Sequence, residues 1–200
     1  MKKQHVNIIL ASASPRRKQL LESCGFNLSV MVSNIDETPR ENESAKDYVL
    51  RNAKEKGIAI SSKVTSSELV ISADTIVVTK EGAILEKPLD ASHAKKMLRE
   101  LSQNTHIVYT AYAITQNKCE LISRIIETKV TFRTLSDNEI DSYIASGEPF
   151  DKAGSYGIQG AAMSFVEHIE GSYTNVMGLP LSHVMNDLTI LAKTSDKQEG

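Results

Sequence analysis

Six charged side chains in the first half of the chain have the types and spacing needed for chemistry on a polyphosphate. They are an arginine pair, two lysines and two acids: Arg16, Arg17, Lys56, Lys87, Glu37 and Asp74. Carboxylates hold a hard divalent cation, basic groups bind phosphate oxygens, and water can serve as the nucleophile. The set therefore predicts a metal-assisted displacement on a polyphosphate.

The arginine pair falls in the first turn of an expected helix. Val6–Leu10 is typical of a buried strand, Ser14 can cap the helix that follows, and Pro15 suits its first position. We expect the helix to end at Gly25. A helix N-terminus is already positive, so two arginines and the hydroxyls there favour a bound anion such as a nucleotide phosphate. A solvated arginine pair after an ordinary turn is the alternative.

One acid interrupts the most apolar segment of the chain. Leu69–Val78 is almost continuously apolar, as in a central strand covered on both faces, but it contains Asp74. An unpaired buried carboxylate costs several kcal/mol, so its presence favours a metal, a cation or a reaction that needs the charge. The alternative, a strand that ends at Ala73, is disfavoured because Ile76–Val78 continue the apolar pattern.

The remaining pattern alternates helices and strands. In the helix expected from Ser44 to about Ser61, the side chains of Tyr48, Asn52 and Lys56 share one face. Further helices are predicted from the caps at Asp90, Ser136 and Pro180, and strands over 26–32, 106–115 and 120–134, with a hairpin at Asn117-Lys118. The glycine-punctuated loop over 147–160 is predicted to be ordered and functional, and a second glycine-punctuated loop is expected over 171–178.

Composition narrows the possible partners. The 200 residues carry a formal net charge of −2 and no tryptophan, so neither a basic field nor a stacking platform for nucleic acid is indicated. Two distant cysteines predict no disulfide framework, and no Cys/His cluster has zinc spacing. No run is long enough to span a membrane, and the apolar run before Pro15 is too short for a secretory signal. We therefore expect a cytoplasmic protein without a membrane partner.

Familiar phosphate and nucleophile motifs are absent, but five other segments carry a resemblance. There is no Walker loop, no Gly-x-Gly-x-x-Gly and no Gly-x-Ser-x-Gly. The five segments are Ser-Ala-Ser-Pro-Arg-Arg (12–17), Ser-Ala-Asp-Thr-Ile-Val (72–77), Glu-Lys-Pro (86–88), Asp-Lys-Ala-Gly-Ser-Tyr-Gly-Ile-Gln-Gly (151–160) and Gly-Ser-Tyr-Thr-Asn-Val-Met-Gly-Leu-Pro-Leu (171–181). In this order they closely resemble the Maf family of nucleoside triphosphate pyrophosphatases, over about Ile8 to Leu191. The last two look like the branch that acts on dTTP and UTP.

The resemblance implies a fold and a reaction. The fold is α/β, an elongated mixed β-sheet with flanking helices that form two lobes around a central cleft, in one domain over 1–193. The polar residues 194–200 are expected to form a disordered tail. The reaction is hydrolysis of dTTP or UTP to the monophosphate and pyrophosphate, with Mg²⁺ or Mn²⁺, commonly in a homodimer. Its implied purpose is removal of unwanted pyrimidine nucleotides, with a link to arrested septum formation and cell division.

The resemblance also implies residue roles. Asp74 accepts the proton of water, with Lys56 and Lys87 as catalytic partners, and Glu37 and Asp74 hold the metal. The substrate-binding positions are Ser12, Arg16, Arg17, Thr75 and Gln159, of which Arg16, Thr75 and Gln159 select the nucleotide. One departure is visible, because Ala111 stands where the family usually has glycine.

Two other hypotheses remain open. One is a housecleaning pyrophosphatase for purine nucleotides such as inosine or xanthosine triphosphate. The other is a septum regulator that binds a nucleotide without turnover, which the complete set of carboxylates and lysines disfavours.

Overall fold

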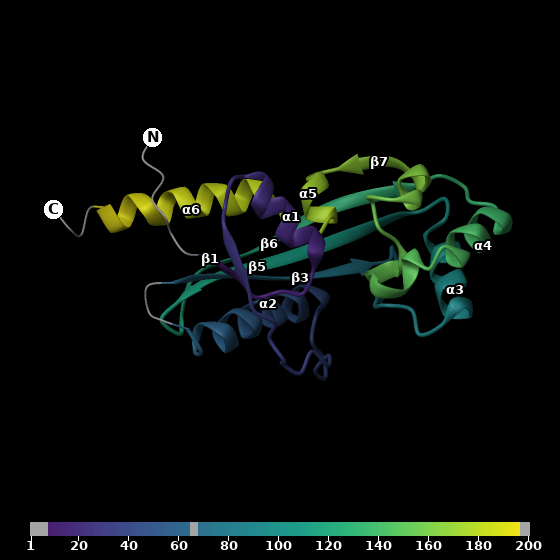
Figure 1. Cartoon of the computed structure of the whole chain (residues 1–200). Helices are drawn as coiled ribbons and strands as arrows, with labels where there is room; N and C mark the ends of the chain where they lie inside the picture. Colours follow the sequence, from purple (N-terminus) through teal and green to yellow (C-terminus); the bar gives the residue numbers. More distant parts are fainter. Residues whose placement is uncertain (1–7, 65–67, 197–200) are drawn as a thin grey trace.

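The computed structural model describes residues 8–64 and 68–196. A seven-stranded mixed sheet runs through its length, with helices on both faces (Figure 1). The strand order is β2-β1-β3-β5-β6-β7, and β4 pairs with β3. Only the β1–β2 and β1–β3 pairs are parallel; the other pairs in this described sheet are antiparallel. The α/β fold with an elongated mixed sheet is confirmed.

Most of the predicted helices and strands are present, in the predicted order along the chain. The strands are β1 (Ile8–Leu10), β2 (Leu28–Val30), β3 (Leu69–Val78), β4 (Ile84–Leu85), β5 (Thr105–Gln116), β6 (Cys119–Phe132) and β7 (Val166–Glu170). The helices are α1 (Pro15–Ser23), α2 (Ala45–Ser61), α3 (Ala91–Leu101), α4 (Asp137–Ala145), α5 (Tyr173–Val176) and α6 (Leu181–Asp196), with 3₁₀ turns at Glu148–Asp151, Ala153–Ser155 and Ala161–Phe165. No helix in the described ranges is long and apolar enough to cross a bilayer.

Helix starts follow the local chemistry of the sequence. The side chains of Ser14, Ser44 and Asp90 accept the predicted capping hydrogen bonds from backbone N–H groups. Ser136 and Glu139 form the complete capping box. Gly25, which follows α1, has a φ of +84°, a conformation that glycine adopts without strain. The predicted boundaries of α1, α2 and α3 are therefore confirmed closely.

Several boundaries differ from the prediction. The strand expected over 26–32 is only Leu28–Val30, and the first two residues of the strand expected from Val6 lie outside the described residues. Helix α6 continues to Asp196, past the expected end of the domain at residue 193. Strand β7 and the short helix α5 were not predicted. The hairpin at Asn117-Lys118 is confirmed, and both residues have positive φ.

Strand β3 is central and positions the acid that the sequence singles out. It pairs with β1 on one side and β5 on the other, and α2 packs against it. Eight of its ten residues are buried and the other two are partly buried, as continuous apolarity predicts, and Asp74 lies opposite Ala111 of β5. Ala111 is fully buried and has no positive φ, so the departure from the family pattern leaves β5 regular at this point.

Candidate active site

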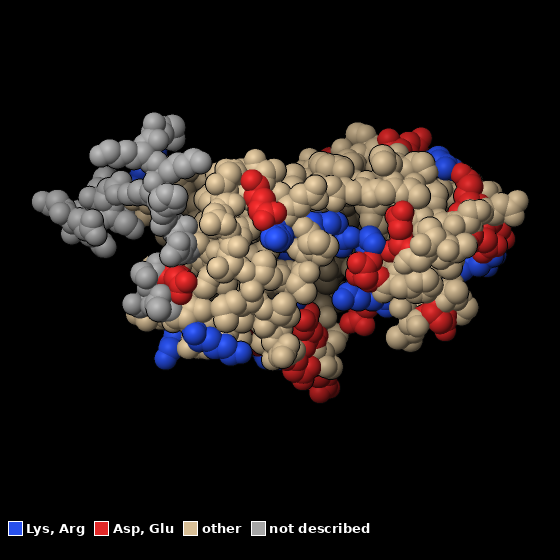
Figure 2. All heavy atoms as spheres, viewed as in Figure 1, with Lys and Arg blue, Asp and Glu red and all other residues tan. Residues whose placement is uncertain are grey.

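Two adjoining cavities open near the middle of the sheet. The larger, of about 350 Å³, is charged; the smaller, of about 160 Å³, combines a hydrophobic wall with polar and charged side chains and is called the apolar cavity for that wall. Ser14, Arg16 and Asp151 line both. Figure 2 shows acidic and basic side chains gathered around a hollow on this face. One wall comes from the β1–α1 turn and the other from the glycine-rich segment after α4, which is the central cleft expected between two lobes.

The charged cavity brings most of the predicted residues together. Its lining includes the expected hydroxyl, acids and lysines: Ser12, Glu37, Lys56, Asp74 and Lys87. These residues come from the β1–α1 turn, the loop before α2, helix α2, strand β3 and the turn after β4. The sequence spacing alone does not determine this proximity, because it depends on how β1 and β3 pair.

Asp74 is buried but paired. Its Oδ1 accepts a hydrogen bond from Lys56 Nζ at 2.8 Å, and its Oδ2 accepts one from Asn52 Nδ2 at 3.2 Å. The expectation that a buried acid at this position needs a cation is therefore confirmed, because the Lys56 ammonium group supplies the charge. Asn52 and Lys56 lie four residues apart on α2, so their predicted common face is the one turned toward β3.

Lys56 joins the two carboxylates. Its Nζ lies 2.6 Å from Glu37 Oε2 and 2.8 Å from Asp74 Oδ1, so both acids converge on one cationic group. Oxygen donors of this kind suit Mg²⁺ or Mn²⁺, which are held by one or two carboxylates together with substrate phosphates and water. Within the described ranges, no group of three or more His, Cys, Asp and Glu side chains could hold a metal by itself. The two acids therefore fit a divalent cation whose remaining ligands come from substrate or water.

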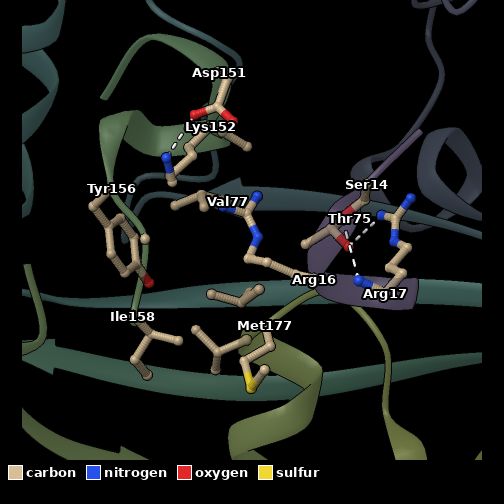
Figure 3. Close-up of a pocket in the computed structure, with 14 residues that line it drawn as sticks. Ser14, Arg16, Arg17, Thr75, Val77, Asp151, Lys152, Tyr156, Ile158 and Met177 are labelled. Atoms are coloured by element: carbon tan, nitrogen blue, oxygen red, sulfur yellow. Dashed lines mark hydrogen bonds and ion pairs between the residues drawn. The ribbon is translucent and has the colours of Figure 1, made fainter. Parts of the chain in front are cut away.

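Arg16 and Lys87 are the cavity cations that carry no protein partner. Among the described residues, neither side chain makes a hydrogen bond or ion pair, and both line the charged cavity. Arg16 also reaches into the apolar cavity beneath Asp151 and Lys152 (Figure 3). Such groups are available to an anion, as the helix-start argument predicts.

Arg17 differs from its neighbour. Its guanidinium donates to Ser12 Oγ at 2.9 Å, to the carbonyls of Ala73 and Gly178 at 2.8 Å, and to Thr75 Oγ1 at 2.9 Å. Burial lowers the pKa of Arg17, with Asp74 acting in the opposite direction. Four of the five guanidinium donors bind protein atoms, so Arg17 ties α1 to β3 instead of offering a free bidentate fork.

Ser12 and Thr75 belong to the same network. Ser12 Oγ also accepts the backbone N–H of Ser14 at 3.2 Å, and Thr75 Oγ1 lies 3.0 Å from Thr110 Oγ1. Thr75 lines the apolar cavity. Both hydroxyls thus lie at the cavities, with their orientation fixed by neighbouring protein groups; Figure 3 shows Thr75 beside Arg17.

Gln159 lies further from the two cavities than the other predicted site residues. Its side chain is exposed and lines neither of these cavities, whereas Gly157 and Ile158 line the apolar one. A Cβ on Gly157 would lie 2.7 Å from Lys152 Cε, so a larger residue here would have to displace the end of the Lys152 side chain. The segment approaches the cavity as predicted, and the role of the Gln159 amide stays a prediction.

The apolar cavity was not predicted as a unit. Its hydrophobic wall joins strands β3 and β5 to the glycine-rich loops through Val77, Val108, Tyr156, Ile158, Val176 and Met177. The structure also adds Asn52, Asp151 and Lys152 to the site. An Asp-Lys pair among four glycines was the available signal for the last two, and the shared helix face was the signal for Asn52.

This constellation belongs to a known family. Residues 7–191 match the family model described as Maf-like protein, and the chain is a member of that family. A dTTP/UTP pyrophosphatase from Salmonella typhimurium strain LT2 is 47% identical over 196 residues, covering 96% of this chain and 98% of the relative. A dTTP/UTP pyrophosphatase from Escherichia coli O157:H7 is 45% identical over 197 residues, covering 97% and 99%.

A solved structure supports the fold. A HAM1 protein from Coxiella burnetii superposes with a TM-score of 0.52 over 92% of this chain and 98% of that chain, at 14% identity. At this identity the likeness concerns the fold alone.

Proposed function

We propose that this protein hydrolyses dTTP and UTP to the nucleoside monophosphate and pyrophosphate. The observation that carries the proposal is the pair of cavities joined at Arg16, one with acids and lysines and the other with an apolar wall. A triphosphate matches the first and a pyrimidine base the second. The two relatives of 45–47% identity and nearly full coverage bear this activity in their names.

In the proposed reaction, Asp74 takes a proton from water. The water oxygen forms a bond to phosphorus at the phosphoanhydride bridge between the α- and β-phosphates. The P–O bond of that bridge breaks, and the electron pair of the broken bond stays on the bridging oxygen, which departs with the leaving phosphate group. The ammonium groups of Lys56 and Lys87 stabilise the developing negative charge. Lys56 donates a hydrogen bond to one oxygen of Asp74 and Asn52 donates one to the other, which fixes the orientation of the carboxylate that takes the proton.

The substrate-binding positions divide between direct and indirect roles. Arg16 binds phosphate, and it lies close enough to the apolar cavity to sense the base as well. Arg17 and Ser12 act on the substrate through the hydrogen bonds that shape the β1–α1 turn. Thr75 and Gln159 select the nucleotide in this proposal.

Glu37 and Asp74 are the residues that would hold a divalent cation, Mg²⁺ or Mn²⁺. When bound, the ion supplies charge neutralisation for the phosphate oxygens. Lys56, which lies between the same two acids, keeps them together.

The wider proposal follows the family resemblance. The enzyme is a cytoplasmic homodimer that clears unwanted pyrimidine nucleotides and is linked to arrested cell division. Light scattering coupled to size-exclusion chromatography tests the dimer, because a monomeric mass would contradict it.

The activity itself is tested by pyrophosphate release. Wild-type protein with Mg²⁺ is assayed against dTTP, UTP, CTP, ITP and XTP, and the highest kcat/KM is expected for dTTP and UTP. A preference for ITP or XTP would favour the purine-type alternative. Nucleotide binding without any pyrophosphate would favour a regulator without turnover.

Base selection is tested at Gln159. Its amide offers a donor and an acceptor, which match the O4 and N3–H edge shared by thymine and uracil, whereas cytosine presents the opposite order. A base that leaves these groups unpaired loses about 1–3 kcal/mol per group. Gln159→Ala should therefore narrow the dTTP-to-CTP ratio of kcat/KM. Gln19→Ala, at an exposed position of α1, is the control. An unchanged dTTP-to-CTP ratio of kcat/KM in Gln159→Ala would show that other residues select the base.

A further inference from the structure

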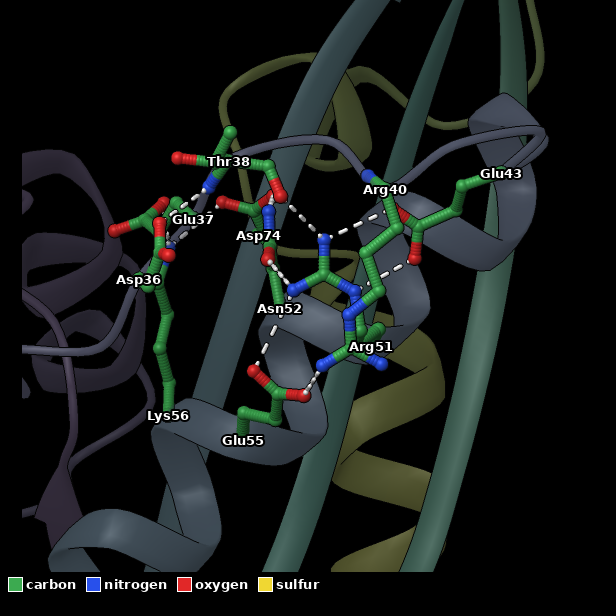
Figure 4. A network of polar contacts seen from close by, with 10 residues as sticks. All are labelled: Asp36, Glu37, Thr38, Arg40, Glu43, Arg51, Asn52, Glu55, Lys56 and Asp74. Atoms are coloured by element: carbon green, nitrogen blue, oxygen red, sulfur yellow. Dashed lines mark hydrogen bonds and ion pairs between the residues drawn. The ribbon is translucent and has the colours of Figure 1, made fainter.

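One arginine hydrogen-bonds both the loop that carries Glu37 and the side chain that donates to Asp74, although it lines none of the cavities described above. Arg51 lies on α2 directly before Asn52, and its side chain is 11% exposed. It binds the loop that carries Glu37 and the amide that binds Asp74 (Figure 4). This placement suggests an indirect effect on both carboxylates.

All five N–H donors of Arg51 have an acceptor. Nε and Nη2 form a fork with the two oxygens of Glu43 at 2.6 and 2.8 Å, and Nη2 also donates to the Thr38 carbonyl at 3.1 Å. Nη1 donates to Asn52 Oδ1 at 3.1 Å and to Glu55 Oε2 at 3.4 Å. The fork lowers the pKa of Glu43 to about 2, so the pair is ionised at neutral pH. A lysine, with one point charge and three donors, cannot reproduce this arrangement.

The contact with Asn52 determines which way its amide points. An arginine only donates, so the group facing Nη1 must be the amide oxygen. The amide nitrogen is then the atom that faces Asp74 Oδ2, at 3.2 Å. Asn52 is fully buried, so a flipped amide would set its oxygen against the carboxylate with no water to compensate. Arg51 therefore fixes the donor that holds the second oxygen of Asp74.

The contacts between Arg51 and the loop over residues 33–43 restrict the position of the second acid, Glu37. Residues 33–43 contain no helix or strand, and the side chain of Glu37 is 48% exposed. Arg51 binds the carbonyl of Thr38, the next residue, and the carboxylate of Glu43 at the end of the loop. These two anchors, together with Lys56, define where the Glu37 carboxylate can lie.

We propose that Arg51 is a positioning residue that sets Asp74 through Asn52 and Glu37 through the Thr38 carbonyl, without touching the substrate. The inference rests on the proposed dTTP hydrolysis, in which these two acids act. Groups that orient the residues around a metal or a reacting centre typically change activity 10–100-fold when they are removed. A 10–100-fold loss of kcat is accordingly expected when the guanidinium fork is replaced.

The test compares Arg51→Lys with a matched arginine fork elsewhere. Arg124 of β6 binds both oxygens of buried Asp187 at 2.7 Å and lines none of these cavities, so Arg124→Lys removes an equivalent fork. Arg51→Lys should lose kcat for dTTP about 10–100-fold with KM within about threefold, whereas Arg124→Lys keeps kcat within about threefold at a comparable loss of Tm. Equal kcat losses in the two variants, or an Arg51→Lys variant with more than half of the wild-type kcat, would overturn the proposal.

Two further measurements separate this inference from the proposed function. Amide hydrogen exchange over residues 33–43 should rise in Arg51→Lys and not in Arg124→Lys, whichever nucleotide the protein cleaves. Unchanged exchange in that segment would overturn the positioning role even if dTTP hydrolysis is confirmed. Should Arg51→Lys not fold, Glu43→Gln removes the charge of the fork partner and should show the same pattern at smaller amplitude. Wild-type protein that cleaves no nucleotide would overturn the proposed function alone.

Discussion

At the scale of single residues, the proposed chemistry depends on Asp74 and its two partners, Asn52 and Lys56. Asp74→Asn keeps the shape and the bond from Lys56 but removes the proton acceptor. General-base catalysis contributes typically 10²–10⁴-fold, so kcat for dTTP should fall by at least about that factor with a smaller change in KM. The nearby exposed Asp36, which accepts the Thr38 N–H, gives the control Asp36→Asn with near-normal activity. Retention of more than about a tenth of the turnover in Asp74→Asn would show that another group is the base.

The adjacent arginines should respond differently to the same substitution. Arg16 has no protein partner within the described chain, so Arg16→Lys should lower kcat/KM for dTTP and leave Tm unchanged. Arg17 donates four hydrogen bonds to protein, and hydrogen bonds to charged groups contribute about 1.5–3 kcal/mol each, so Arg17→Lys should also lower Tm by several degrees. Calorimetry beside the pyrophosphate assay distinguishes the two effects. Equal Tm values for both variants would contradict the structural role of Arg17.

At the scale of elements, the approach of α2 to the sheet decides where Asn52 and Lys56 lie. A Cβ on Gly57 would be 2.7 Å from Ser72 Oγ and 3.0 Å from Thr115 Cγ2, so the helix rests directly on β3 and β5. Alanine is the better helix former by about 1 kcal/mol, but overpacking a close contact costs about 1–3 kcal/mol. Gly57→Ala should therefore lower both Tm and dTTP turnover. If it raised Tm with full activity, the close packing of α2 would not matter for the site.

Elements defined by local sequence patterns could be predicted, whereas those that depend on long-range pairing could not. Caps and apolar periodicity are local, so the starts of α1, α2 and α3 and the full extent of β3 could be predicted closely. Strand β7 mixes Glu167, His168 and Glu170 with two apolar residues and depends on pairing with β6, which no local pattern contains. The network of Arg17 likewise joins residues 161 positions apart, so its donors could not be assigned before the fold was known.

At the scale of the whole molecule, a buried histidine links stability to pH. His106 lies among Phe132 and Tyr156, and burial lowers its pKa to about 3. The unfolded chain binds this proton below its ordinary value of about 6.5 and the folded chain does not, so the free energy of unfolding falls as pH drops below about 6.5. The slope from this group is at most about 1.4 kcal/mol per pH unit.

Denaturant unfolding between pH 7.5 and 5 measures this dependence. The Tyr156 hydroxyl lies 2.8 Å from His106 Nε2, and His106→Gln keeps a hydrogen-bonding partner for it. This variant should make the free energy of unfolding less dependent on pH between pH 7.5 and 5. The exposed His168→Gln is the control and should retain the wild-type slope. Identical slopes in all three proteins would contradict a neutral, buried His106.

The two cavities draw most of their walls from different stretches of the chain. The charged wall comes from residues 11–87 with Asp151, whereas the loops over 151–158 and 176–177 supply much of the apolar wall. Because the proposed base site lies against those loops, substitutions there should change which base binds while the acids and lysines keep their positions. In the proposed division of roles, the loops after α4 can change nucleotide preference without moving the residues proposed for bond cleavage, and Arg16 and Thr75 join the two functions because they line the apolar cavity from the first half of the chain.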